Sequence, residues 1–84
     1  MVYVYVLYSI FDGQLYTGCT RDLRKRLHQH NAGTVRATVN RRPLTLIYYE
    51  ASLREQDAFR REKYLKTTYG KRYIKTRCRT YLTG

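Results

Sequence analysis

The stretch Val2-Tyr3-Val4-Tyr5-Val6-Leu7-Tyr8-Ser9 decides the fold, because it is an unbroken run of β-branched, aromatic and aliphatic residues. Such a run favours a strand that is covered on both faces, so it predicts the central strand of a sheet over residues 2–9. The following pair Asp12-Gly13 is a typical hairpin-turn signal. Residues 14–19 are therefore predicted to return as a second, antiparallel strand.

A helix is predicted next, over residues 21–31. Thr20 precedes it as a candidate N-cap, and Asp22 suits the positive end of the helix dipole in the first turn. Gly33 follows the helix and is a plausible left-handed terminator. Residues 33–42 carry several arginines and only scattered apolar side chains, which favours a mobile, basic loop.

The second half of the chain adds one strand and two helical segments. A third strand is predicted over residues 44–50 and a second helix over residues 53–66, with Ser52 and Glu55 spaced as a capping box. Gly70 is predicted to interrupt the helical pattern before a last segment, residues 71–82. The element order ββαβαα indicates an α+β fold, and the 84 residues indicate a single domain over 1–84.

The charge balance points to a polyanionic partner. The chain has 17 Lys and Arg against 6 Asp and Glu, a formal charge of +11, and nucleic acid is the commonest polyanion. A membrane surface is less favoured, since no segment combines a clean apolar face with a cationic one, and no apolar run approaches the ~20 residues that span a bilayer. The N-terminus lacks the basic region of a secretory signal, so we expect a cytoplasmic protein. Cys19 and Cys78 are too few for a disulfide framework or a zinc site.

Five polar side chains form a candidate site. Arg26 and His30 are i, i+4 neighbours beside the apolar stripe of the first predicted helix, so both can reach one ligand. Glu62 falls on the apolar face of the second helix, where a carboxylate is costly unless it pairs with a cation or a metal. Tyr5 and Tyr16 lie on the two paired strands and can present hydroxyl groups to the same side.

This set suits phosphodiester hydrolysis. Glu62 could hold a hard divalent ion such as Mg²⁺ or Mn²⁺, which needs only one or two protein carboxylates. Arg26 would clamp a phosphate oxygen, and a tyrosine or His30 would take the proton of the attacking water. Free tyrosine titrates near pH 10, so a tyrosine base needs a nearby cation to lower its pKa.

Simpler explanations exist for each residue taken singly. The two tyrosines could only pack the strands, and Arg26 could reach past apolar surface to solvent or pair with Glu62. His30 could cap the C-terminus of its helix, and His28, on the opposite face, is expected to be solvated. The coincidence of the whole set favours a site.

In these residues the chain resembles the GIY-YIG nuclease superfamily, in its small stand-alone bacterial branch, which is similar to the nuclease domain of the excinuclease C subunit. Tyr3-Val4-Tyr5 matches the first motif with Tyr for Gly, and Tyr16-Thr17-Gly18 matches the second with Thr for Ile. The helical arginine and histidine of the family fall on Arg26 and His30, and the metal-binding glutamate falls on Glu62.

The resemblance implies a three-stranded antiparallel sheet flanked by helices and metal-dependent DNA cleavage. In that scheme Tyr5 is the general base or positions the water, His30 accepts or relays the proton, and Tyr16 orients the water or phosphate. Arg26 steadies the charge, and Glu62 holds the metal. Several larger members use an asparagine late in the domain, some use a second histidine in the loop after the helix, and they append DNA-recognition domains. These 84 residues have none of them, so binding shaped by DNA structure or by a partner is expected.

The leading hypothesis is therefore a divalent-metal-dependent DNA endonuclease, structure-selective or weakly sequence-specific, in DNA repair or recombination. Alternatives are a catalytically weak nucleic-acid-binding module of the same fold, or a basic protein that docks on ribosomes or a repair complex. RNA is not excluded as a ligand, and a monomer or a transient dimer fits equally well. Candidate nucleic-acid contacts, which could instead serve only solubility, are Arg24, Arg36, Arg41, Arg42, Lys66, Lys71 and Arg72.

Overall fold

Three antiparallel strands form one sheet in the computed structural model, which describes residues 1–84. The strands β1 (Val2–Ser9), β2 (Leu15–Thr20) and β3 (Leu44–Ser52) lie in the order β2-β1-β3. The prediction that residues 2–9 form the central strand is thus confirmed. The predicted α+β class, the three-stranded sheet and the order ββαβαα are confirmed as well.

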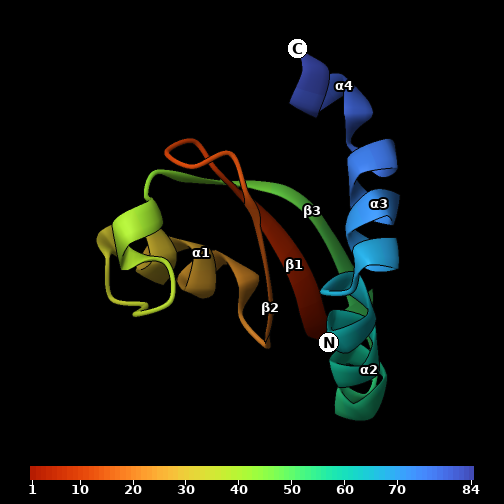
Figure 1. Ribbon diagram of the computed structural model, residues 1–84. Helices are drawn as coiled ribbons and strands as arrows, with labels where there is room; N and C mark the ends of the chain where they lie inside the picture. The colour runs from red at the N-terminus through yellow and green to blue at the C-terminus, as the bar shows by residue number, and fades with distance from the viewer.

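Helices cover both faces of this sheet (Figure 1). Helix α1 (Leu23–Ala32) lies on one side, and α2 (Glu55–Leu65) and α3 (Thr68–Arg77) lie on the other. A short helix α4 (Arg79–Thr83) ends the chain, and a 3-10 turn, Val39–Arg41, precedes β3. No helix has the length and apolar character needed to cross a lipid bilayer.

Alternation along β1 divides the core into two clusters. Val2, Val4 and Val6 are buried against the apolar side chains of α2 and α3. Tyr5 and Leu7 point to the other face, where Leu23 and Leu27 of α1 pack against them. Because neighbouring strand residues point to opposite faces, Tyr5 is directed into the interface between the sheet and α1.

The predicted start of α1 needs correction. The N-cap is Asp22, not Thr20, and its carboxylate accepts a 3.0 Å hydrogen bond from the backbone N–H of Lys25. Thr20 is instead the last residue of β2, where it pairs with Tyr3 of β1. The predicted terminator is confirmed, since Gly33 adopts a left-handed φ of 83°.

The capping box predicted for the second helix is also wrong. Ser52 is the last residue of β3 and pairs with Val2. Helix α2 begins at Glu55 after Arg54, which makes no side-chain cap. Ser52 therefore pairs within the sheet and does not cap the helix.

Gly70 lies inside α3 and does not interrupt it, contrary to the prediction. A Cβ atom at this position would strike the backbone of Tyr64 and Leu65, so only glycine lets α3 cross so close to the end of α2. Thr67 caps α3, and its hydroxyl accepts a hydrogen bond from the Gly70 N–H at 3.1 Å. The predicted last segment is divided at Cys78 between α3 and α4.

The segment 33–42 has fixed contacts, where a mobile loop was expected. Val35 and Thr38 are buried. The Ser9 hydroxyl donates to the carbonyl of Arg41 at 2.6 Å, and the Arg41 guanidinium pairs with Asp12 at 2.6 Å. This segment is therefore held against the tip of the β1–β2 hairpin.

Candidate active site

Tyr5 and His30 meet between the sheet and α1. The Tyr5 hydroxyl lies 2.8 Å from Nε2 of His30, which stands in the last turn of α1. Both residues are buried, at 2% and 0% exposure. His30 therefore does not serve as an exposed cap of its helix, and its burial explains why a histidine lies beside the apolar stripe. His28 is exposed, as predicted.

Gly18 makes room for the Tyr5 ring. The two residues face each other across β1 and β2, and a Cβ atom on Gly18 would collide with the Tyr5 hydroxyl and ring. The absence of a side chain on β2 thus lets the tyrosine ring lie over the neighbouring strand and reach α1. This contact gives the glycine of Tyr16-Thr17-Gly18 a steric role in placing Tyr5.

Thr38 completes the group and was not predicted from the sequence. Its hydroxyl lies 2.7 Å from Nδ1 of His30, and the residue is fully buried. Thr38 stands in the basic segment 33–42, which has no periodic pattern that would mark a core residue. The only sign in the sequence that this segment packs on the core is its position just before Pro43, where the chain enters the third strand.

The chain Thr38–His30–Tyr5 is continuous. Nδ1 and Nε2 of His30 each lie within hydrogen-bond distance of a hydroxyl oxygen, that of Thr38 at 2.7 Å and that of Tyr5 at 2.8 Å. A neutral imidazole carries a proton on one ring nitrogen and accepts at the other, so the ring connects the two hydroxyls as a donor on one side and an acceptor on the other.

Arg26 approaches the same hydroxyl from α1. Its Nε donates to the Tyr5 oxygen at 3.4 Å, and its Nη1 donates to Gln29 at 3.2 Å. Arg26 and Gln29 also line a cavity of about 360 Å³ beside β2 and the start of α1. The guanidinium group therefore links the buried tyrosine to a polar, open recess.

Tyr16 borders the group without a hydrogen bond of its own. Its ring meets the His30 ring edge to face, with centroids 5.2 Å apart, and its hydroxyl makes no hydrogen bond within the chain. The side chain is half-buried, on the same face of the sheet as Tyr5. Tyr5, Tyr16, Arg26 and His30, four of the five predicted site residues, are thus brought together.

Glu62 comes from a helix on the other face of the sheet, and no hydrogen bond or ion pair joins it to Tyr5, Arg26 or His30. It stands on α2, which packs on β1 and β2, and only 22% of its side chain is exposed. Its partner is Lys66, at 3.0 Å, and not Arg26 as one sequence interpretation suggested. Burial is the main cause of the raised pKa values of Tyr5 and Cys19, and the negative charge of Glu62 adds to both.

Glu62 is the residue that could hold a metal ion. No cluster of three His, Cys, Asp or Glu side chains forms anywhere in the structure, which excludes a closed cage of the zinc type. A Mg²⁺ or Mn²⁺ ion differs in this respect, because it keeps several waters and needs only one or two carboxylates. Glu62 is largely covered and pairs one carboxylate oxygen with Lys66, and it fits such an ion.

Burial sets the protonation of the central pair. It lowers the pKa of His30 to about 4, with the charge of Arg26 acting in the same direction. Burial raises the pKa of Tyr5 above its ordinary value of 10, although the hydrogen bond from Arg26 opposes this shift. Near neutral pH both groups are therefore uncharged, and the Tyr5 hydroxyl keeps its proton.

The predicted nucleic-acid contacts differ in whether their side chains already have a partner within the protein. Arg41 is held by Asp12, and Lys66 by Glu62. Arg42 donates to the carbonyl of Val39 at 2.9 Å and covers Gly33. The remaining four are exposed and form no ion pair: Arg24, Arg36, Lys71 and Arg72.

Comparisons with known proteins find one matching family and several bacterial relatives. The family described as "GIY-YIG catalytic domain" matches residues 1–77. A UPF0213 protein of Bacillus pumilus is 44% identical over 66 residues, which are 77% of this chain and 66% of that protein. The UPF0213 protein SAG0778 of Streptococcus agalactiae is 45% identical over 65 residues, 76% of this chain and 73% of that protein.

A solved structure has the same fold. The NMR structure of the UPF0213 protein BH0048 from Bacillus halodurans superposes with a TM-score of 0.57 at 31% identity. The match covers 90% of this chain and 84% of that chain. The sheet and its helices are thus shared with a small bacterial protein of similar size.

Proposed function

Because this chain belongs to the GIY-YIG catalytic-domain family, which is of nuclease type, we propose that it is a metal-dependent endonuclease that hydrolyses phosphodiester bonds in DNA. The observation that carries the proposal is the Tyr5 hydroxyl. It is buried, yet it contacts two polar side chains of α1 at once, the His30 ring at 2.8 Å and the Arg26 guanidinium at 3.4 Å. A proton acceptor and a cation on one hydroxyl are what a tyrosine base requires.

Tyr5 is the group that acts on the attacking water. In the proposed step the Tyr5 oxygen takes a proton from the attacking water while its own proton passes to Nε2 of the neutral His30. The Arg26 N–H stabilises the negative charge that builds on the Tyr5 oxygen. This transfer needs the His30 proton on Nδ1, where the Thr38 oxygen can accept it.

The remaining residues bind and orient the phosphate. Arg26 has donors free beyond its contacts to Tyr5 and Gln29, so it can clamp a phosphate oxygen and stabilise the charge that builds in the transition state. Tyr16 presents an uncommitted hydroxyl beside it. A Mg²⁺ or Mn²⁺ ion held by Glu62 would supply positive charge that neutralises the phosphate and favours ionised oxygen nucleophiles.

Recognition of the substrate rests on charge more than on base contacts. The formal charge of +11 attracts a polyanion regardless of sequence. The cutting activity is accordingly structure-selective or weakly sequence-specific, and such an activity suits a cytoplasmic role in DNA repair or recombination. Exposed Arg24 and Arg36 would contact the phosphate backbone near α1.

A catalytically weak nucleic-acid-binding module is the second candidate. The ion pair between Glu62 and Lys66 favours it, because a carboxylate engaged by a lysine is less available to a metal ion. Such a module would keep the same fold and the same basic surface. It would bind DNA without turnover.

Nicking of supercoiled plasmid DNA distinguishes the two. The endonuclease converts supercoiled to open-circular DNA with Mg²⁺ or Mn²⁺ and stops when EDTA is added. The binding module shifts the plasmid in a gel but leaves it supercoiled under every metal condition. Running the same assay on folded RNA tests whether the activity is limited to DNA.

A further inference from the structure

The last part of the chain carries the least compensated charge of the molecule. Residues 63–84 contain seven Lys or Arg and no Asp or Glu. Elsewhere the acidic side chains are already engaged: five of the six form ion pairs, and Asp22 caps α1. Nothing in the fold therefore neutralises the cations of α3 and α4.

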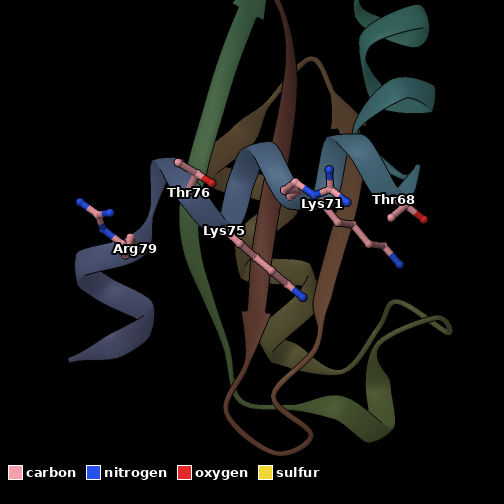
Figure 2. Close-up of a pocket in the computed structure, with 6 residues that line it drawn as sticks. Thr68, Lys71, Lys75, Thr76 and Arg79 are labelled. Atoms are coloured by element: carbon pink, nitrogen blue, oxygen red, sulfur yellow. The ribbon is translucent and has the colours of Figure 1, made fainter.

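Four of these cations lie on one side of α3 and at the start of α4. Together with two threonines they line an open groove of about 420 Å³, and no apolar side chain contributes to it. We call these residues the α3 stripe: Thr68, Lys71, Arg72, Lys75, Thr76 and Arg79. Figure 2 shows them as sticks along the helix, with the sheet behind it.

The α3 stripe lies outside the residues that α3 buries against the sheet, and its Lys71 and Lys75 also border a second cavity beside the β1–β2 hairpin. The residues that α3 buries are Gly70 and Ile74, and Ile74 packs against the valines of β1. Tyr5 and His30 lie on the other face of that sheet. The stripe is thus a surface separate from the group around Tyr5.

Like charges at helical spacing weaken a helix unless a ligand neutralises them. Lys71 and Lys75 are i, i+4 neighbours, as are Lys75 and Arg79, and none of them has an acidic partner. The stripe runs about 12 Å along the helix axis from Thr68 to Thr76. A row of this length and charge is suited to an extended polyanion.

The residues that line the groove indicate which class of polyanion it binds. Protein–protein interfaces have an apolar core, and the groove offers no apolar side chain. Nucleic-acid interfaces are polar and strongly cationic, and arginine, lysine and threonine are typical donors to phosphate oxygens. We infer that the α3 stripe binds the phosphodiester backbone of a nucleic acid, at a site separate from the Tyr5 group.

This inference rests on the proposed function for the identity of the ligand, but it does not require that the protein cuts DNA. Lys71 and Arg72 were already predicted to contact nucleic acid. The inference adds Lys75, Arg79 and the hydroxyls of Thr68 and Thr76 as contacts to phosphate oxygens. Because backbone contacts are independent of sequence, the stripe would strengthen binding without choosing the bond that is cut.

The test is binding of a labelled 20-base-pair duplex in EDTA, where no cleavage occurs. The variant Lys71→Gln/Lys75→Gln removes two stripe charges, and the matched control Arg54→Gln/Lys63→Gln removes two exposed charges outside α3. We expect the stripe variant to raise Kd on the order of tenfold and to reduce the salt slope of log K by about 2. The control should change both much less.

Three outcomes would overturn the inference: equal loss in the two variants, no loss in the stripe variant, or tighter binding of a poly-glutamate peptide than of DNA at equal salt. Circular dichroism of both variants checks that they are folded. Because the binding is measured in EDTA, the loss in the stripe variant is expected whether or not the wild-type protein cuts plasmid DNA in the nicking assay. Failure of the proposed function is thereby distinguished from failure of the inference.

Discussion

The Tyr5 hydroxyl and the His30 ring are joined by a 2.8 Å hydrogen bond, although 25 positions separate the two residues in the chain. The bond lies where β1 is covered by α1, and Arg26 reaches the same oxygen at 3.4 Å. Burial by itself keeps Tyr5 protonated, whereas the Arg26 N–H favours negative charge on its oxygen and the neutral His30 ring can accept its proton. The chemistry proposed for this protein follows from these two contacts.

Removing this oxygen should abolish turnover and leave the fold intact. We expect Tyr5→Phe to reduce DNA nicking by at least about a hundredfold, because the phenyl ring keeps the packing and loses the base. The measurement is nicking rate at saturating DNA, with duplex binding followed separately. Tyr8→Phe, on the same strand but outside the group, is the control. Equal losses in the two variants would argue against a special role for Tyr5.

The neutral His30 makes stability depend on pH. Its folded pKa is about 4, whereas an unfolded histidine titrates near 6.5. Between these values the unfolded chain binds a proton that the folded chain does not, so the free energy of unfolding falls as the pH drops from 6.5 to 4. The expected loss is on the order of 3 kcal/mol.

Urea unfolding across this pH range measures the effect of His30. His30→Asn should flatten the dependence, because no imidazole remains at the buried position. His28→Asn, which alters an exposed histidine of the same helix, should leave the dependence unchanged. A wild-type curve that is flat from pH 6.5 to 4 would contradict the buried neutral state.

Thr38 should act through His30. Thr38→Val preserves the shape of the side chain but leaves Nδ1 of His30 without its partner, at a cost of about 1–3 kcal/mol in the free energy of unfolding. Thr38→Ser restores a hydroxyl and should recover most of the loss. Nitrogen chemical shifts of the His30 ring give a second readout: the proposed transfer needs the proton at Nδ1 in the wild-type protein, and this preference should weaken in Thr38→Val. An unchanged tautomer would show that Thr38 only packs.

Gly18 should be intolerant of even one added carbon. Alanine is normally favoured over glycine within a strand, yet here its Cβ would meet the Tyr5 ring. We expect Gly18→Ala to lower the free energy of unfolding by about 1–3 kcal/mol and to reduce nicking as Tyr5 shifts. In a Tyr5→Leu background, which lacks the colliding atoms, the same change should cost much less, and additive costs would refute the contact.

The strands and the hairpin could be read from the sequence because their signals are local. The run Val2–Ser9 and the Asp12-Gly13 turn specify their conformations without help from distant residues. The helix starts were misjudged where a distant strand competed. Thr20 and Ser52 are good caps in isolation, but each pairs with β1 and so extends a strand.

The candidate site was predictable in composition but not in its connections. The i, i+4 spacing of Arg26 and His30 on a helix indicated both residues, and the structure places both against Tyr5. Thr38 was missed because its role exists only after the segment 33–42 folds back onto α1. The crossing of α3 over α2, which explains Gly70, is likewise a contact between helices that no local pattern records.

The most direct test of the account is the nicking rate of Glu62→Gln against wild type, with Mg²⁺ and saturating plasmid DNA. Lys66→Gln is the control, since it removes the ion-pair partner and leaves the carboxylate. The account predicts a loss of at least about a thousandfold for Glu62→Gln and an unchanged or higher rate for Lys66→Gln. Equal nicking by wild type and Glu62→Gln, with both proteins folded, would contradict metal-dependent hydrolysis at this site.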